Sequence, residues 1–283
     1  MTRPYLGYRL GLPAWGFSGW KDRFFTAAPS QLASYAQVFN TVEGNTTFYG
    51  IPDFSTVERW RRDVAGTDFE FCFKIPRSVT HERNPRWGDL KQFLDAVGRL
   101  GEHLGPFLVQ FPAHLEPRHL PVIERLFDQL PACFRYVLEL RHLGFFARPQ
   151  LIEPLLEKYN AGLVMFDSRP LYQGDRNHPE VLAGKHQKPD VPVVENVHNR
   201  LVFVRLILHP DPQYNAAFVE EWLQRVTGYI GAGHAVYFMV HCPNNLHCPD
   251  FAEDFHRRLM GYSQSLALQP LPAWPIPRQE ALF

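Results

Sequence analysis

Candidate catalytic and ligand-binding side chains gather after an apolar segment near residue 40. Residues 40–50 read Asn-Thr-Val-Glu-Gly-Asn-Thr-Thr-Phe-Tyr-Gly, so Glu43 and Asn45 follow the apolar residues of a predicted strand. Gly44 between them is expected to allow a tight turn. A carboxylate and an amide on a rigid strand end can bind a polar ligand or transfer a proton. The alternative is a plain turn that leads into a capped helix starting at Thr56.

Similar polar residues follow most of the other apolar segments of the chain. As candidate catalytic residues we select Glu43, Lys74, Glu139, His142 and Asp167, and as candidate ligand-binding residues Asn45, Tyr49, Gln110, Arg141, Arg205, His241 and Asn244. Each of them, taken alone, is explained as well by a structural ion pair that ties two strands together. Taken together they predict a pocket in which the side-chain ends of Glu43, Lys74, Glu139, Arg141 and Asp167 share one cavity.

The cations and amides of this set suit an anionic or polyhydroxylated ligand. Arg141 and Arg205 could bind a phosphate or carboxylate group, because a guanidinium matches the geometry of both. Asn45, Gln110 and Asn244 could bind hydroxyl groups.

The acids and bases of the set suggest two kinds of chemistry. Glu43 could exchange a proton with His142 or His241. Lys74 could form a Schiff base with a carbonyl compound, as lysines near strand ends can in barrel aldolases. The alternative for Lys74 is a salt bridge to Glu43 or Glu139.

A metal site is the other chemical alternative. Histidines, glutamates and Asp167 include enough ligand types for a metal-dependent phosphoesterase or a nuclease-like enzyme. No His-x-x-x-His or Cys-x-x-Cys spacing occurs, and Lys and Arg side chains are interleaved with the acidic ones. The sequence therefore predicts no cofactor and no tightly bound transition metal.

Eight apolar segments alternate with helical patterns and must position these side chains. The predicted strands are Tyr5 to Leu10, Val38 to Glu43, Phe69 to Ile75, Phe107 to Phe111, Tyr136 to Leu140, Gly162 to Phe166, Leu201 to Leu208 and Ala235 to Val240. This alternation predicts an α/β protein with a single (β/α)8 TIM-type barrel, whose chemistry lies at the carboxyl ends of the strands. The alternative is an open doubly wound sheet, although no Gly-x-Gly-x-x-Gly follows the first strand.

Two segments lack the periodicity of the rest. The sixth crossover, Arg169 to Arg200, is long and irregular, and a loop of this length in a compact domain is usually functional or mobile. The Pro-rich tail, Gln269 to Phe283, is expected on the surface. We predict one barrel domain over residues 1–283.

The composition argues against several classes of partner, although a local basic patch stays open as an alternative. The 283 residues carry a formal net charge of zero and a pI of about 7.2, which argues against nucleic-acid binding and against an anionic membrane surface. No apolar run is long enough to cross a bilayer. The four cysteines are sparse and irregularly spaced, as reduced thiols of the cytoplasm are.

Several motifs, in consistent order from about Trp15 to Asn245, resemble those of the YecE-like family, also called domain of unknown function 72. They are the segment 40–50, Phe-Lys-Ile-Pro at 73–76 with Thr80-His81, Gln-Phe-Pro at 110–112, Glu-Leu-Arg-His at 139–142 with Phe145-Phe146, and Asp167-Ser168. The resemblance implies a TIM-type barrel and a soluble bacterial protein, but no reaction. The chain departs from the family's pattern after strands one, seven and eight.

These observations predict a protein that acts on, or binds, a small anionic or sugar-like ligand by acid–base chemistry. The ligand would be phosphorylated or polyhydroxylated, and a hydrolase or an isomerase would suit it. A ligand-binding or sensing barrel without turnover is the alternative from a different class. The sequence predicts no oligomeric state.

Overall fold

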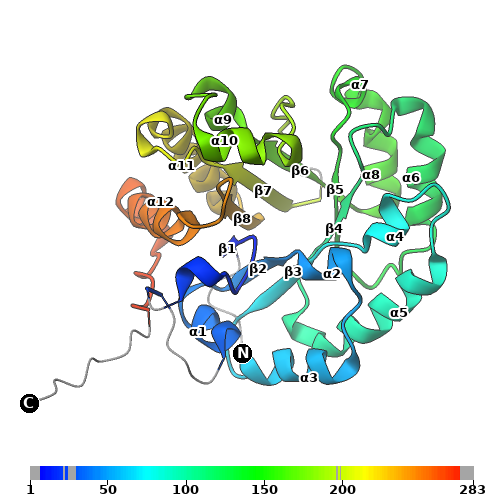
Figure 1. Ribbon diagram of the computed structural model, residues 1–283, viewed down its shortest axis with the longest axis horizontal. Coiled ribbons are helices and arrows are strands. Elements are labelled where there is room, and N and C mark those ends of the chain that lie inside the picture. The colour runs from blue at the N-terminus through cyan, green and yellow to red at the C-terminus, as the bar shows by residue number, and fades with distance from the viewer. Residues whose placement is uncertain (1–6, 22, 25–29, 196, 198, 275–283) are drawn as a thin grey trace, which may run out of the picture.

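Eight parallel strands form a barrel with helices around its outside (Figure 1). The computed structural model describes residues 7–21, 23–24, 30–195, 197 and 199–274. The strands are β1 (Tyr8–Leu12), β2 (Thr41–Gly44), β3 (Glu70–Phe73), β4 (Phe107–Gln110), β5 (Tyr136–Glu139), β6 (Gly162–Asp167), β7 (Leu201–Ile207) and β8 (Ala235–His241). They pair in the order β3-β2-β1-β8-β7-β6-β5-β4. The predicted TIM-type barrel is confirmed.

The junction between β3 and β4 closes the barrel with fewer contacts than the other junctions. Two isolated parallel bridges join the strands there, Phe71 to Leu104 and Lys74 to Leu108. The amide of Ile75 also donates to the carbonyl of Leu108 at 3.0 Å. The residue that follows β3 is therefore held directly beside β4.

The helices lie between and after the strands, as the alternation predicts. They are α1 (Gln31–Val38), α2 (Thr46–Tyr49), α3 (Phe54–Asp63), α4 (Arg77–Thr80), α5 (Trp87–Val97), α6 (Leu120–Phe127), α7 (Leu143–Phe146), α8 (Glu153–Tyr159), α9 (Arg169–Gln173), α10 (Pro179–Gly184), α11 (Ala216–Gly231) and α12 (Cys248–Tyr262). Short 3-10 turns are η1 (Ser18–Trp20), η2 (Gly98–His103), η3 (Pro117–His119), η4 (Pro149–Leu151), η5 (Lys185–Gln187), η6 (Pro212–Tyr214) and η7 (Gln264–Leu266).

Two local expectations around the polar segment need correction. The helix after it begins at Phe54, because the Asp53 carboxylate rather than Thr56 caps it, accepting from the Thr56 amide at 2.7 Å. Gly44 is required for space rather than for a turn. A Cβ on Gly44 would lie 2.5 Å from the ring of Phe73 on the next strand.

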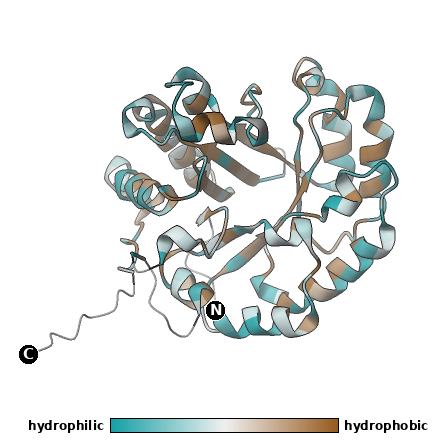
Figure 2. Ribbon diagram, viewed as in Figure 1, coloured by the Kyte–Doolittle hydropathy of each residue, from teal (hydrophilic) through white to brown (hydrophobic). Residues whose placement is uncertain are grey.

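The strands are mainly hydrophobic, whereas the surrounding helices mix polar and apolar residues (Figure 2). One large cluster of buried apolar side chains lies between strands and helices, and includes Trp20, Tyr35, Phe71 and Trp222. Because both faces of the strands are covered, this core fixes the position of each strand end.

The sixth crossover is more ordered than its sequence suggests. It contains the two short helices α9 and α10 and the turn η5. The chain then passes over the carboxyl end of the barrel, where Gln187 and Lys188 reach the pocket described below.

The C-terminal tail is only partly covered by the structure. Residues 275–283 lie outside the described residues, so their expected surface position is untested. Before them, the Trp274 ring packs against Phe24 and Phe39, with centroid distances of 5.2 and 5.5 Å. None of the helices within the described part of the chain has the length and apolarity needed to cross a membrane.

Candidate functional site

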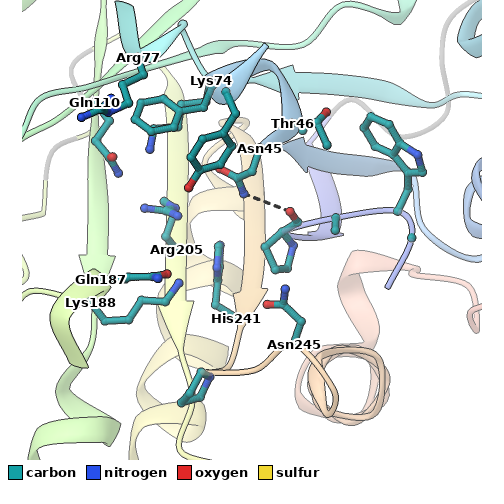
Figure 3. Close-up of a pocket in the computed structure, with 18 of the residues that line it drawn as sticks. Asn45, Thr46, Lys74, Arg77, Gln110, Gln187, Lys188, Arg205, His241 and Asn245 are labelled. Atoms are coloured by element: carbon teal, nitrogen blue, oxygen red, sulfur yellow. Dashed lines mark hydrogen bonds between the residues drawn. The ribbon is translucent and has the colours of Figure 1, made fainter. Parts of the chain in front are cut away.

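A pocket of about 730 Å³ opens at the carboxyl end of the barrel. Its walls come from the strand ends and the loops after them, and Figure 3 shows the labelled side chains around the shared space. The polar lining residues are Gln31, Asn45, Thr46, Tyr49, Lys74, Arg77, His81, Gln110, Arg141, Gln187, Lys188, Arg205, His241 and Asn245. Of the predicted site residues, seven thus line one pocket.

The lining is strongly basic. It includes the five basic residues Lys74, Arg77, Arg141, Lys188 and Arg205, and none of the described residues that line it is an aspartate or glutamate. Glu43 and Glu139 pair with two of these arginines, Arg205 and Arg141, and their own side chains are buried.

The Glu43 carboxylate is completely enclosed by hydrogen-bond donors. Arg205 donates from Nε and Nη2 at 2.7 and 2.8 Å, Asn45 donates at 2.9 Å, and His241 Nε2 lies at 3.2 Å. Burial alone would raise the pKa of Glu43, but Arg205 and His241 outweigh it and hold the pKa well below its usual range.

Glu139 has a similar environment on the opposite side of Arg205. Its oxygens accept from Arg205 Nη1 at 2.5 Å, Gln110 Nε2 at 2.5 Å and Arg141 Nε at 2.7 Å. Burial opposes ionisation, yet Arg205 and Arg141 lower the pKa of Glu139 to about 2. Glu43 and Glu139 are therefore permanent counter-ions of the arginines, with their oxygens already occupied.

Lys74 differs from the arginines because no carboxylate pairs with it. Among the described residues it makes no salt bridge to Glu43 or Glu139, so that alternative is wrong. Its Nζ instead lies 3.5 Å from the centroid of the Phe48 ring. Burial is the main cause that lowers the pKa of Lys74 to about 7; Arg141 and Arg205 lower it further, while Glu139 opposes them.

Lys188 brings a second lysine into the pocket from the sixth crossover. Burial of its amine and the charge of Arg205 lower its pKa to about 8. None of the carboxylates in the described ranges pairs with it. No sequence motif points to Lys188, although the unusual length of its loop is a signal that could have found it.

Two histidines of the wall are uncharged at neutral pH. Burial lowers the pKa of His241 to about 4 and, with the charge of Lys74, that of His81 to about 3. His241 Nδ1 is buried and has no hydrogen-bond partner among the described residues. This nitrogen is therefore a buried polar atom whose hydrogen-bonding capacity the described residues leave unused.

The family was identified by comparison with known proteins. The model of the family described as "Protein of unknown function DUF72" matches residues 9–275. The chain belongs to the DUF72 family. It is 30% identical to the UPF0759 protein YecE of Escherichia coli strain K12 over 279 residues, which is 97% of this chain and 99% of YecE.

Solved structures of DUF72 proteins share the fold. A DUF72 protein from Thermotoga maritima MSB8 superimposes with a TM-score of 0.64 at 18% identity, covering 89% of this chain and 98% of that one. One from Enterococcus faecalis V583 has a TM-score of 0.63 at 20% identity, covering 92% of this chain and 96% of that one.

Asp167 does not share the pocket of this DUF72 chain, contrary to expectation. Its carboxylate accepts from Arg169 Nε at 2.9 Å and Nη2 at 2.7 Å, and from Trp222 Nε1 in α11 at 2.8 Å. Alternation along β6 explains this, because Phe166 contacts Arg205 and so faces the barrel interior. Asp167 must then face the helices.

Two further expectations fail in the loops. His142 does not line the pocket; its Nδ1 accepts from the Gly144 amide at 3.0 Å and caps α7. Asn244 is also absent from the wall, where its neighbour Asn245 stands instead. Asn244 holds the loop by accepting from the Leu246 amide at 2.9 Å. Loop residues cannot be oriented by the period of a strand.

A second charge cluster lies at the opposite end of the barrel. Glu70, at the start of β3, accepts from Arg9 at 2.9 Å and from Arg135 at 2.8 Å, and Tyr237 donates to it at 2.5 Å. Buried charges at strand ends are therefore not by themselves a sign of function in this family member. The pocket and its unpaired lysines distinguish the carboxyl end.

No group of three or more His, Cys, Asp or Glu side chains in the described segments is arranged to hold a metal ion. The metal content of the protein stays a prediction.

Proposed function

We propose that the pocket binds a small organic anion and that the chain acts on it as an enzyme. The phosphate or carboxylate group of the ligand would lie among the five basic side chains of the wall. The observation that carries this proposal is the charge of the lining, which has five basic residues and, within the part of the chain that the structure describes, no acidic one.

The positive charge of the wall is only partly neutralised. Glu43 and Glu139 compensate Arg205 and Arg141. Lys74, Arg77 and Lys188 pair with none of the carboxylates that the structure describes. A bound anion would supply the missing negative charge in a partly buried place, where charge-assisted hydrogen bonds are strong.

Polar groups beside the cations would bind the rest of the ligand. Asn245 and Gln187 provide amides in the same wall, which can hydrogen-bond to hydroxyl groups. A role in chemistry, rather than in binding alone, is supported by the pKa of Lys74, because strongly shifted pKa values in clefts are typical of active sites.

Isothermal titration calorimetry at pH 7 and low salt would test the proposal, with inorganic phosphate, pyrophosphate and malonate as probes. We expect at least one probe to bind. The Lys188→Met substitution should lower the affinity for that probe about tenfold or more, because one unpaired cation is lost. Lys91→Met is the matched control, since Lys91 is exposed on α5 and pairs with Asp95. Absence of binding by all three probes, or equal loss in both variants, would refute the proposal.

A further inference from the structure

The position of Lys74 is fixed by hydrogen bonds on both sides of its backbone. Its carbonyl accepts from the Thr47 hydroxyl in α2 at 2.9 Å, and the following amide, that of Ile75, donates to Leu108 beside β4. The side chain thus begins from a rigid point on the rim of the barrel. Rigid placement is what a reacting group needs.

The amine of Lys74 is buried but forms no ion pair with a described carboxylate. Only 8% of the residue is exposed, and Nζ has no ion pair with any described carboxylate. Buried lysines are rare and are normally paired with an acid. The Phe48 ring, 3.5 Å from Nζ, covers it on one side, and Lys74 belongs to the wall of the pocket on the other.

We propose that Lys74 forms a Schiff base with a small aldehyde or ketone that also carries a phosphate or carboxylate group. This inference rests on the proposed anion site, because the anionic group would be held by the other cations of the wall. The carbonyl carbon of the same molecule would then lie against Nζ.

The reaction balances without an oxidant, a reductant or a metal. The lone pair of the neutral amine forms a bond to the carbonyl carbon, and the carbonyl oxygen takes up a proton. The nitrogen then expels that oxygen as water, after a second proton transfer. Amine, carbonyl compound and one proton thus give an iminium ion and water.

The surroundings of Lys74 favour both stages. A pKa of about 7 leaves about half of the amine neutral at pH 7, whereas an exposed lysine is almost entirely protonated. The iminium product is a cation, which the face of the Phe48 ring and the charge of Glu139 stabilise. His81, whose ring centroid is 4.9 Å from that of Phe48, lies in the same wall and is uncharged at pH 7, so it adds no positive charge beside the iminium ion.

Reductive trapping tests the inference. Wild-type protein is incubated at pH 7 with glycolaldehyde phosphate or with glycolaldehyde, which have the same reactive carbon but differ in charge. Cyanoborohydride then adds hydride to the iminium carbon and leaves a stable secondary amine, and peptide mass spectrometry locates it. We expect labelling of Lys74 to be at least about tenfold faster than that of any exposed lysine, and faster with the phosphate than without it.

Variants separate this inference from the proposed function. Lys74→Met should lose the adduct completely, whereas its affinity for the calorimetric probes should fall only as far as that of Lys188→Met, because each variant removes one cation of the wall. Lys188→Met should keep an adduct at Lys74 but lose the preference for the phosphorylated aldehyde. Scattered labelling without preference for Lys74, while the probes still bind, would overturn the Schiff base and leave the anion site standing. Labelling of Lys74 at equal rates by both aldehydes would overturn the anionic substrate class.

Discussion

Glu43 and Arg205 are 162 positions apart in the chain and form a two-pronged ion pair inside the barrel, with Nε to Oε2 at 2.7 Å and Nη2 to Oε1 at 2.8 Å. Arg205 also reaches Glu139, so one guanidinium joins β2, β5 and β7. This bridge forms the floor behind the pocket. It leaves the lysines of the wall as the groups that can meet a ligand.

Replacing Glu43 should therefore damage stability first. Glu43→Gln keeps the shape of the side chain but removes the buried negative charge beside Arg205, and we expect a loss of roughly 3 kcal/mol in the free energy of unfolding. Urea denaturation measures it. Glu58→Gln on exposed α3, which breaks a pair with Arg61, should cost less than about 0.5 kcal/mol. Equal stability of Glu43→Gln and wild type would contradict the counter-ion role.

The pH dependence of stability should reflect Glu139. Its folded-state pKa of about 2 is below its unfolded value, so its contribution is complete above about pH 4.5 and is lost as the pH falls toward 2. We expect wild type to lose stability over this range more steeply than Glu139→Gln, which has no proton to bind there. Urea denaturation at several pH values between 2 and 4.5 measures the free energy of unfolding of both proteins. If it falls equally with pH in the two, the pKa of Glu139 is not lowered.

The charged form of Lys74 should lower the free energy of unfolding, whereas the charged form of Glu139 raises it. The folded-state pKa of Lys74, about 7, is below the unfolded value. The destabilisation by the buried ammonium is therefore complete below pH 7 and disappears as the pH rises toward 10.5. Lys74→Met should be more stable than wild type by about 2 kcal/mol at pH 6, after the lost contact with Phe48 is counted. The difference should vanish near pH 10. A less stable variant at pH 6 would show that the ammonium is well accommodated.

Asp167 should matter for folding but not for the ligand. Asp167→Asn weakens its bonds to Arg169 while an amide can still contact Trp222, and we expect a loss of about 2 kcal/mol in unfolding free energy. The affinity for the anion probes should stay within about twofold of wild type, because Asp167 faces the helices. A tenfold loss of affinity in a folded variant would place Asp167 in the site after all.

The sequence predicted the fold and most of the pocket for one physical reason. The strand ends of a barrel meet at one rim, so Glu43, Lys74, Gln110, Glu139 and Arg205 could be grouped without any knowledge of contacts. It could not tell which of these groups face a ligand, since that depends on partners distant in the chain. Glu43 was expected to transfer protons, but the position of Arg205 makes it a counter-ion.

Other residues were beyond reach because periodicity does not orient loops. Lys188 lies in a crossover whose unusual length is a signal of function, but its irregular sequence does not show which of its residues turns back over the barrel. The prediction that Asp167 faces the pocket was wrong because of the register of its strand. A strand end can point inward or outward, and one residue of register separates Phe166, which faces the interior, from Asp167, which does not.

The most direct test of the central claim is to locate a bound anion. Crystals of the protein soaked with selenate, a dianion with the shape of phosphate, would be measured at the selenium absorption edge. We predict an anomalous peak inside the pocket, in contact with at least two of Lys74, Arg141 and Lys188. A pocket without selenium in a crystal that binds it elsewhere would contradict the anion site.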